Sequence, residues 1–162
     1  LALEQYFDYP LLGRLMRHFG ALPVDPENPK PGSLVRMMRT LKAGQVCGIF
    51  PEGGGSHDGL PIEPRPGLGA LALRAGVPVV PAALWGAHRA WPPGQLLPRP
   101  EPIRLRFLPP IRPSEFPDPE RVGRGPARAK LTRMVMCRIA DGLGELAGEG
   151  VCRAARERMC GA

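Results

Sequence analysis

The residues best suited to chemistry lie in one glycine-rich segment, residues 50–59, with the sequence Phe-Pro-Glu-Gly-Gly-Gly-Ser-His-Asp-Gly. Consecutive glycines let several backbone N–H groups converge on one anion, and the Ser56 hydroxyl adds a further donor. We expect Glu52 to accept hydrogen bonds from loop amides or from substrate hydroxyls. The segment predicts a cradle for a phosphate or polar head group. It lacks a Walker lysine and a GxGxxG pattern, so an exposed flexible turn is the alternative.

The elements around this segment predict an α/β unit. The apolar run Gln45–Phe50 is typical of a short strand, Gly67–Ala75 has apolar residues at helical spacing, and Val77–Leu84 is rich in β-branched residues. A strand, a helix and a strand in this order form a right-handed unit with two parallel strands. The glycine-rich segment would then follow the carboxyl end of a strand, where open parallel sheets bind their ligands.

The flanking segments extend the same architecture. Helices are predicted over 10–19 and 33–42, the second with Ser33 as its N-cap. A brief strand is predicted over 21–24, and a half-solvated strand over 103–108, where apolar residues alternate with arginines. We therefore expect an α/β fold with a central mixed, mostly parallel sheet that is flanked by helices.

The end of the chain predicts a connector and a basic amphipathic helix. Residues 109–119 are proline-rich, and beyond them apolar residues recur three and four positions apart: Leu131, Val135, Ile139, Leu143 and Leu146. Gly142 and Gly144 are expected to weaken the second half of this helix, which would span about 20 residues. Such a helix docks on the parent core or lies on an anionic membrane, and docking is favoured. We divide the chain into a domain, 1–113, and a connector with a C-terminal helix, 114–162.

The charge balance indicates an anionic partner. The chain carries 22 Lys and Arg against 15 Asp and Glu, a formal net charge of +7, and most of the excess lies in residues 121–162. Nucleic acid, phospholipid head groups and phosphorylated substrates all fit this charge. A nucleic-acid role ranks last, because only 6% of the residues are aromatic and no nucleic-acid-binding motif is present.

Composition excludes several other classes. The sequence contains no run of eighteen apolar residues, so it predicts no membrane span. The four cysteines are too few for a disulfide framework and lack the paired spacing of a zinc site, so we expect no metal and a reducing, cytoplasmic environment. The chain starts at Leu1 without a signal segment, and we expect it to be truncated upstream.

Further motifs occur in a definite order around the glycine-rich segment. Pro-Leu-Leu-Gly at 10–13 and Gly-Ala-Leu-Pro-Val-Asp at 20–25 precede Phe-Pro-Glu-Gly at 50–53. Arg65 and the run Val-Pro-Val-Val-Pro-Ala-Ala at 77–83 follow it. Over residues 5–113 this arrangement resembles the glycerolipid acyltransferase family, whose members include 1-acylglycerol-3-phosphate (lysophosphatidate) acyltransferases.

The resemblance implies transfer of a fatty acyl group from a coenzyme A or acyl carrier protein thioester to a glycerolipid hydroxyl. The implied partners are that acyl donor, a membrane lipid acceptor and an anionic membrane surface, with no other cofactor and no nucleic acid. The protein would be cytoplasmic and peripherally associated with the membrane. Members of the family use a His-x-x-x-x-Asp motif, in which the histidine is the general base for the acceptor hydroxyl.

The resemblance also indicates which residues bind. Substrate binding is assigned to Glu52, Gly53, Gly54, Gly55, Ser56 and Arg65, and the shaping of loop and strand ends to Phe50, Pro51 and Pro81. Gly54 and Gly55 stand where the family usually has Thr and Arg, and Pro26 stands in place of another Arg. Each lost arginine forfeits a charge-assisted contact to phosphate. Arg65 is then the best side-chain phosphate ligand, and other glycerolipid acceptors become plausible.

Two interpretations of function stay open. None of the three histidines, His18, His57 and His88, has an acidic residue five positions later, so no catalytic residue is assigned. One interpretation is an acyltransferase whose histidine motif lies upstream of this sequence, so that the chain by itself is inactive. The other is a non-catalytic lipid-binding or accessory module that kept the fold without the base.

Overall fold

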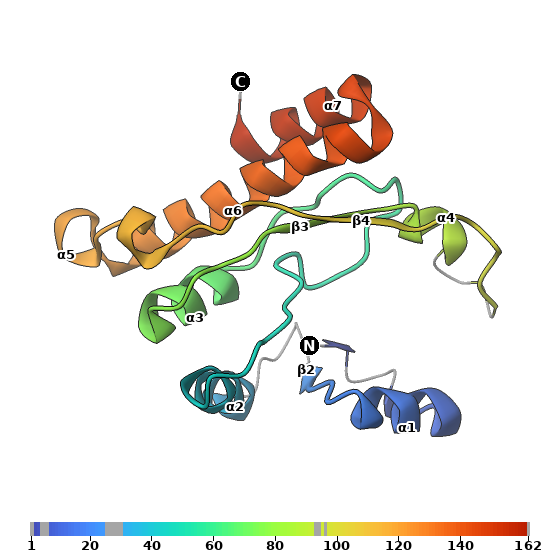
Figure 1. Ribbon diagram of the computed structural model, residues 1–162, viewed down its shortest axis with the longest axis horizontal. Coiled ribbons are helices and arrows are strands. Elements are labelled where there is room, and N and C mark those ends of the chain that lie inside the picture. The colour runs from blue at the N-terminus through green and yellow to red at the C-terminus, as the bar shows by residue number, and fades with distance from the viewer. Residues whose placement is uncertain (1, 4–6, 25–30, 93–94, 96, 162) are drawn as a thin grey trace. The chain divides into compact units, whose positions relative to one another are not determined.

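Helices make up most of the regular structure in the computed structural model of the chain (Figure 1). The structure describes residues 2–3, 7–24, 31–92, 95 and 97–161. These residues form two compact units, Leu1–Phe50 and Pro51–Ala162. Helices and strands occur in both units, in agreement with the predicted mixed class. The domain boundary after residue 113 stays a prediction.

The first unit contains two helices and two very short strands. In chain order these are β1 (Ala2–Leu3), α1 (Pro10–His18), β2 (Pro23–Val24) and α2 (Pro31–Lys42), with β1 and β2 parallel. Both helices were predicted within a few residues. However, α2 begins at Pro31, so Ser33 lies inside its first turn and is not the N-cap that the sequence indicated.

The second unit is built around one long helix. Its elements are α3 (Gly67–Ala75), β3 (Ala82–Trp85), α4 (Ala87–Ala90), β4 (Arg104–Phe107), the short 3-10 helix η2 (Pro113–Glu115), α5 (Pro119–Val122), α6 (Arg124–Ala147) and α7 (Glu149–Cys160). The long helix α6 contacts α3, β3, β4 and α7, and Figure 1 shows α7 folded back beside it. This unit contains the glycine-rich segment from Pro51 onward.

The paired strands of the second unit are antiparallel, which differs from the predicted parallel unit. In the β3–β4 pair, Ala83 lies opposite Arg106 and Trp85 opposite Arg104. Val79 and Ile111 exchange two backbone hydrogen bonds, 3.0 and 2.8 Å long. Prolines have no N–H for a ladder, and Pro78 and Pro81 reduce the strand predicted over Val77–Leu84 to β3 and this isolated bridge.

Residues 45–50 adopt no regular secondary structure, so the strand predicted from this apolar run is wrong. Val46 is 94% exposed. An extended segment becomes a strand only where a neighbour completes its backbone hydrogen bonds. Accordingly, the described residues form two two-stranded sheets, and the central, mostly parallel sheet is not confirmed among them.

The apolar stripe of α6 forms the core of the second unit, as the favoured docking prediction required. Leu131, Val135 and Leu143 are each at most 3% exposed. Ala140 and Leu143 pack in one cluster with Ala83 of β3 and Ala155 of α7. Full burial of a leucine or valine side chain contributes about 1.5–3 kcal/mol, so this stripe is a major source of stability.

Gly142 and Gly144 of α6 are sites of close packing, and whether they also weaken the helix stays a prediction. The helix continues through them from Arg124 to Ala147. A Cβ atom at Gly142 would lie 2.9 Å from both Ala83 Cβ and Leu108 Cδ1, and one at Gly144 would lie 2.6 Å from Cys152 Cβ. The missing side chains let β3 and α7 approach α6 closely.

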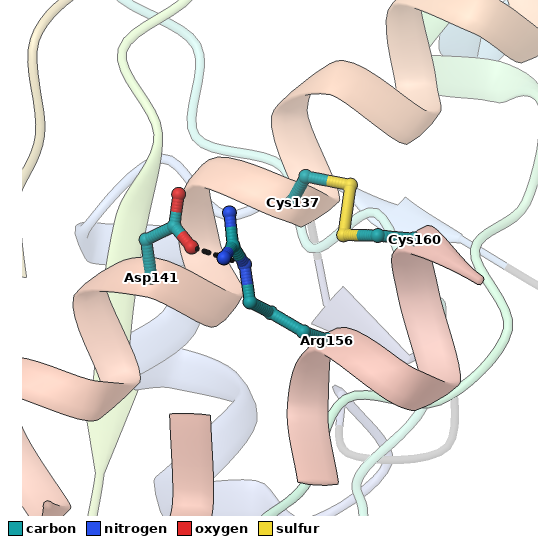
Figure 2. Close-up of a disulfide and its surroundings, with 4 residues drawn as sticks. All are labelled: Cys137, Asp141, Arg156 and Cys160. Carbon is teal, nitrogen blue, oxygen red and sulfur yellow. Dashed lines mark ion pairs between the residues drawn. A yellow bond between two sulfur atoms is a disulfide. The ribbon is translucent and has the colours of Figure 1, made fainter. Parts of the chain in front are cut away.

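The second C-terminal helix, α7, was not predicted, because the sequence analysis placed a single helix after residue 114. Gly148, with φ +100°, separates α6 from α7. Figure 2 shows the Cys137–Cys160 disulfide joining the two helices. Beside it, Arg156 Nε lies 2.8 Å from Asp141 Oδ1. Two of the four cysteines are therefore paired, which the expectation of a reducing environment did not anticipate.

A contact between α3 and α6 generates the first prediction. Gly69 N–H donates to Thr132 Oγ1 at 3.2 Å, and a Cβ atom at Gly69 would lie 2.2 Å from the Arg128 carbonyl oxygen. Gly69→Ala should lower the free energy of unfolding by about 1–3 kcal/mol, because the two helices must separate. Gly67→Ala is the matched control on the same helix, since its Cβ would meet nothing within 4 Å. Urea unfolding followed by tryptophan fluorescence compares the two, and equal midpoints would contradict the close-packing interpretation.

Candidate functional site

The glycine-rich segment belongs to a loop, residues 51–65, whose two ends are held together. The Pro51 carbonyl accepts a hydrogen bond from Arg65 N–H at 2.8 Å. Glu52 Oε2 accepts another from Ile62 N–H at 2.7 Å. These two bonds place Glu52 and Arg65, which are 13 residues apart in sequence, side by side at the base of the loop.

Gly53 completes this base, and its backbone conformation favours glycine. Its φ is +66°, in the left-handed region. A Cβ atom there would lie 3.0 Å from both Cδ and Nε of Arg65. The Arg65 side chain therefore passes directly over the Gly53 backbone. The predicted binding residues Glu52, Gly53 and Arg65 are brought together.

Gly54 and Gly55 lie on the open side of the loop and are exposed. A Cβ atom at Gly54 would meet one atom of the Ile62 side chain at 3.7 Å, and one at Gly55 would meet nothing within 4 Å. The space beside these glycines is open to a ligand. Backbone N–H groups there, together with the guanidinium beside Gly53, suit an anionic or strongly polar group.

Glu52 is the electrostatically perturbed group of the loop base. Partial burial raises the pKa of its carboxyl group, and the hydrogen bond from Ile62 N–H counteracts part of that rise. The carboxylate therefore holds the loop closed, and its partial burial costs solvation free energy. Among the described buried side chains, no nitrogen or oxygen atom lacks a hydrogen-bond partner.

The far side of the loop is organised by Asp58. Its Oδ1 accepts hydrogen bonds from Leu60 N–H at 3.0 Å and from the Ser56 hydroxyl at 3.4 Å. Arg158 of α7 lies beside the same carboxylate, with Nη2 at 2.7 Å from Oδ2. The Arg158 hydrogen bond is the main cause that lowers the pKa of Asp58, followed by the Leu60 hydrogen bond. The hydroxyl of Ser56, predicted to bind substrate, is thus directed to Asp58.

Gly59 fixes the loop against β3 and α4. Its φ is +78°, and a Cβ atom there would lie 2.4 Å from the His88 ring and 2.9 Å from Trp85. The His88 and Trp85 rings meet edge to face, with centroids 4.8 Å apart. Sequence reasoning missed this anchor and the Asp58–Arg158 pair, because the partners are distant in sequence and no local pattern marks them.

The remaining site predictions differ in how the structure places them. Pro81 is fully buried immediately before β3, and its carbonyl accepts Leu108 N–H at 2.9 Å. Phe50 is 66% exposed at the end of the first unit. His57 is an exposed residue of the loop. Pro26 lies outside the described residues.

The described residues contain neither a metal-binding cluster nor a membrane-spanning helix. No group of three or more His, Cys, Asp or Glu side chains among them is arranged to hold a metal ion. In the same part of the chain, no helix combines the length and the apolar character needed to cross a membrane.

The raised pKa of Glu52 predicts a pH effect on stability. A carboxyl whose pKa is higher in the folded state stabilises the fold below its unfolded pKa, and this contribution is lost as pH rises through the folded value. Glu52→Gln keeps an acceptor for Ile62 N–H and removes the ionisation. The gain in unfolding free energy of the variant over the wild type should therefore grow from about pH 4 to about pH 7.

Urea unfolding at several pH values measures this difference. Glu63→Gln is the matched control, because it removes one carboxylate from an exposed position in the same loop. A difference between Glu52→Gln and wild type that stays constant across the pH range would show that burial does not control this group.

The chain is similar in sequence to known enzymes. Over 119 residues the chain is 34% identical to a 1-acyl-sn-glycerol-3-phosphate acyltransferase of Limnanthes douglasii, covering 72% of this chain and 42% of that protein. Over 86 residues it is 34% identical to an enzyme of the same name from Bacillus subtilis (strain 168), covering 53% and 42%. The chain thus spans less than half the length of these relatives.

The fold also has a solved counterpart. The crystal structure of the 1-acyl-sn-glycerophosphate (LPA) acyltransferase PlsC from Thermotoga maritima matches 91% of this chain and 56% of its own, with a TM-score of 0.70 and 24% identity. A family model described as Acyltransferase matches residues 1–85, and that range includes the whole of loop 51–65. Since the match covers more than half of the sequence, this chain belongs to the Acyltransferase family.

Proposed function

We propose that this chain binds the acceptor in an enzyme that transfers a fatty acyl group from a coenzyme A or acyl carrier protein thioester to the hydroxyl of a glycerolipid of the lysophosphatidate type. The observation that carries this proposal is the loop base, where Glu52, Gly53 and Arg65 meet in a chain of the Acyltransferase family. The named relatives, 1-acyl-sn-glycerol-3-phosphate acyltransferases, support the substrate class.

In this reaction the acceptor hydroxyl oxygen attacks the thioester carbonyl carbon, its proton passes to a base, and the thiol leaves. The loop base would hold the acceptor head group, with the Arg65 guanidinium as the cationic contact and the backbone N–H groups of Gly54 and Gly55 as further donors. Glu52 keeps this geometry closed through Ile62. The residues of this loop thus bind and orient the acceptor.

The base for the hydroxyl proton is not assigned within these residues. No histidine of the sequence has an aspartate five positions later. A positioned general base contributes about 10²–10⁴-fold to such a step. We therefore propose that residues 1–162 by themselves bind the acceptor and do not turn over substrate.

Two substitutions in the loop base test acceptor binding. Arg65→Ala should weaken the binding of a short-chain 1-acylglycerol-3-phosphate about tenfold or more, because a charge-assisted hydrogen bond contributes about 1.5–3 kcal/mol. Glu52→Ala should weaken it as well, since the loop base loses its contact to Ile62. His57→Ala is the control in the same loop. Calorimetric titration measures the affinities, and thiol release from acyl-coenzyme A by the wild-type chain should stay at background.

The proposal is contradicted by either of two results. Unchanged affinity in both Arg65→Ala and Glu52→Ala would mean that the acceptor binds elsewhere. Loss of binding in a folded His57→Ala variant would mean that the roles within the loop are assigned wrongly.

We further propose that the protein associates peripherally with anionic membranes through the outer face of α6. The apolar stripe of this helix is buried, whereas Lys130, Arg133 and Arg138 are exposed. Attraction would therefore be electrostatic and would not require insertion of the stripe. A basic residue close to an anionic bilayer contributes about 1 kcal/mol before screening by salt.

Vesicle co-sedimentation tests this surface. Replacing Lys130, Arg133 and Arg138 together by Gln should lower binding to vesicles rich in phosphatidylserine by about tenfold or more, and binding of the wild type should fall as salt rises. A triple variant of Arg74, Arg99 and Arg112, also exposed, removes the same charge from other elements. Equal losses in the two variants would assign the attraction to net charge and not to α6.

A further inference from the structure

We propose that Arg158 of α7 is a positioning residue for the acceptor-binding loop 51–65 and that it acts through Asp58. This inference rests on the proposed function, because it treats the loop as the place where the acceptor head group binds. Arg158 lies 100 positions from Asp58 in sequence and far outside the matched range 1–85.

The contact between the two side chains is two-pronged. Arg158 Nη2 donates to Asp58 Oδ2 at 2.7 Å, and Nη1 approaches Oδ1 at 3.4 Å. A planar guanidinium paired in this way fixes the orientation of a carboxylate as well as its position. Arg158 therefore determines which way the two oxygens of Asp58 face.

The orientation of Asp58 is passed on to the loop. The Oδ1 atom that Nη1 approaches also accepts Leu60 N–H at 3.0 Å and the Ser56 hydroxyl at 3.4 Å. Ser56 ends the run of glycines that is open to a ligand, and Leu60 lies two residues before Ile62, which bonds Glu52. One carboxylate thus links both arms of the loop.

Arg158 is itself held in a fixed helix turn. Met159 is 7% exposed and Ala155 is fully buried. The Cys137–Cys160 disulfide and the Arg156–Asp141 ion pair join α7 to α6 on either side of Arg158 in sequence (Figure 2). The Arg158 side chain, although 44% exposed, thus extends from a helix that is cross-linked to α6 and pairs with a carboxylate in a glycine-rich loop.

The test uses the full 162-residue chain and two readouts. The first is the affinity for a short-chain 1-acylglycerol-3-phosphate, and the second is hydrogen exchange at the Leu60 amide. Arg158→Ala should weaken binding about two- to fivefold, the range of a partly exposed ion pair, and should speed Leu60 exchange. Arg158→Lys should recover part of the affinity. Arg153→Ala is the matched control, since it removes an arginine from an exposed position of the same helix that is not part of the links to α6 or to the loop.

A double-mutant cycle separates positioning from a general loss of charge. If Arg158 acts through Asp58, the affinity of Arg158→Ala with Asp58→Ala should equal that of Asp58→Ala alone. Additive losses, or unchanged affinity and exchange in Arg158→Ala, would overturn the inference. If the wild-type chain does not bind the lipid, the proposed function fails. Without lipid binding, hydrogen exchange at the Leu60 amide still tests whether Arg158 orders the loop. Unchanged exchange in Arg158→Ala would overturn that role.

Discussion

The structure of the second unit depends on how closely α6 approaches its neighbours. At Gly69 and Gly142 the approach leaves no room for a Cβ atom, because the Arg128 carbonyl oxygen, Ala83 and Leu108 occupy that space. Such contact brings the backbones of α3, β3 and α6 together and gives each buried methyl group many partners. The buried Thr132 hydroxyl at this contact accepts a hydrogen bond from Gly69 N–H and donates one to the Arg128 carbonyl.

The candidate site depends on this helix through three separate connections. The packing of α6 on α3 fixes the chain two residues after Arg65, where α3 begins. Its packing on β3 fixes Trp85, which with His88 lies against Gly59. Its packing on α7 fixes Arg158, which pairs with Asp58. A glycine-rich loop loses much conformational entropy when it becomes ordered. The three anchors order part of the loop in advance, so less conformational entropy is lost when a ligand binds.

The proposed acceptor site therefore depends on parts of the chain both inside and outside the Acyltransferase match. The Acyltransferase match ends at residue 85, whereas α6 and α7 occupy Arg124–Ala147 and Glu149–Cys160. The matched part supplies the groups that would contact an acceptor, and the unmatched part supplies their support. Helices α6 and α7 carry nearly all of the basic residues in the last quarter of the sequence, on faces that the core leaves exposed. The proposed attraction to an anionic surface would thus use the exposed face of α6, the helix whose buried face also supports the loop.

The sequence by itself determined the features that depend on residues close together in the chain. Helical spacing predicted α1 and α3, alternation predicted the strand that became β4, and the motifs around Phe50–Gly53 were enough to identify the family. Tertiary structure decided the rest: the antiparallel partner of β3, the packing role of Gly142 and Gly144, the Cys137–Cys160 pairing and the Asp58–Arg158 pair. The physical reason is that periodicity and glycine content determine local conformation. Within one turn or one strand, residues are brought together by their closeness in the chain. Partners 23 or 100 positions apart meet only after the helices have packed, and no local pattern records which residues will meet.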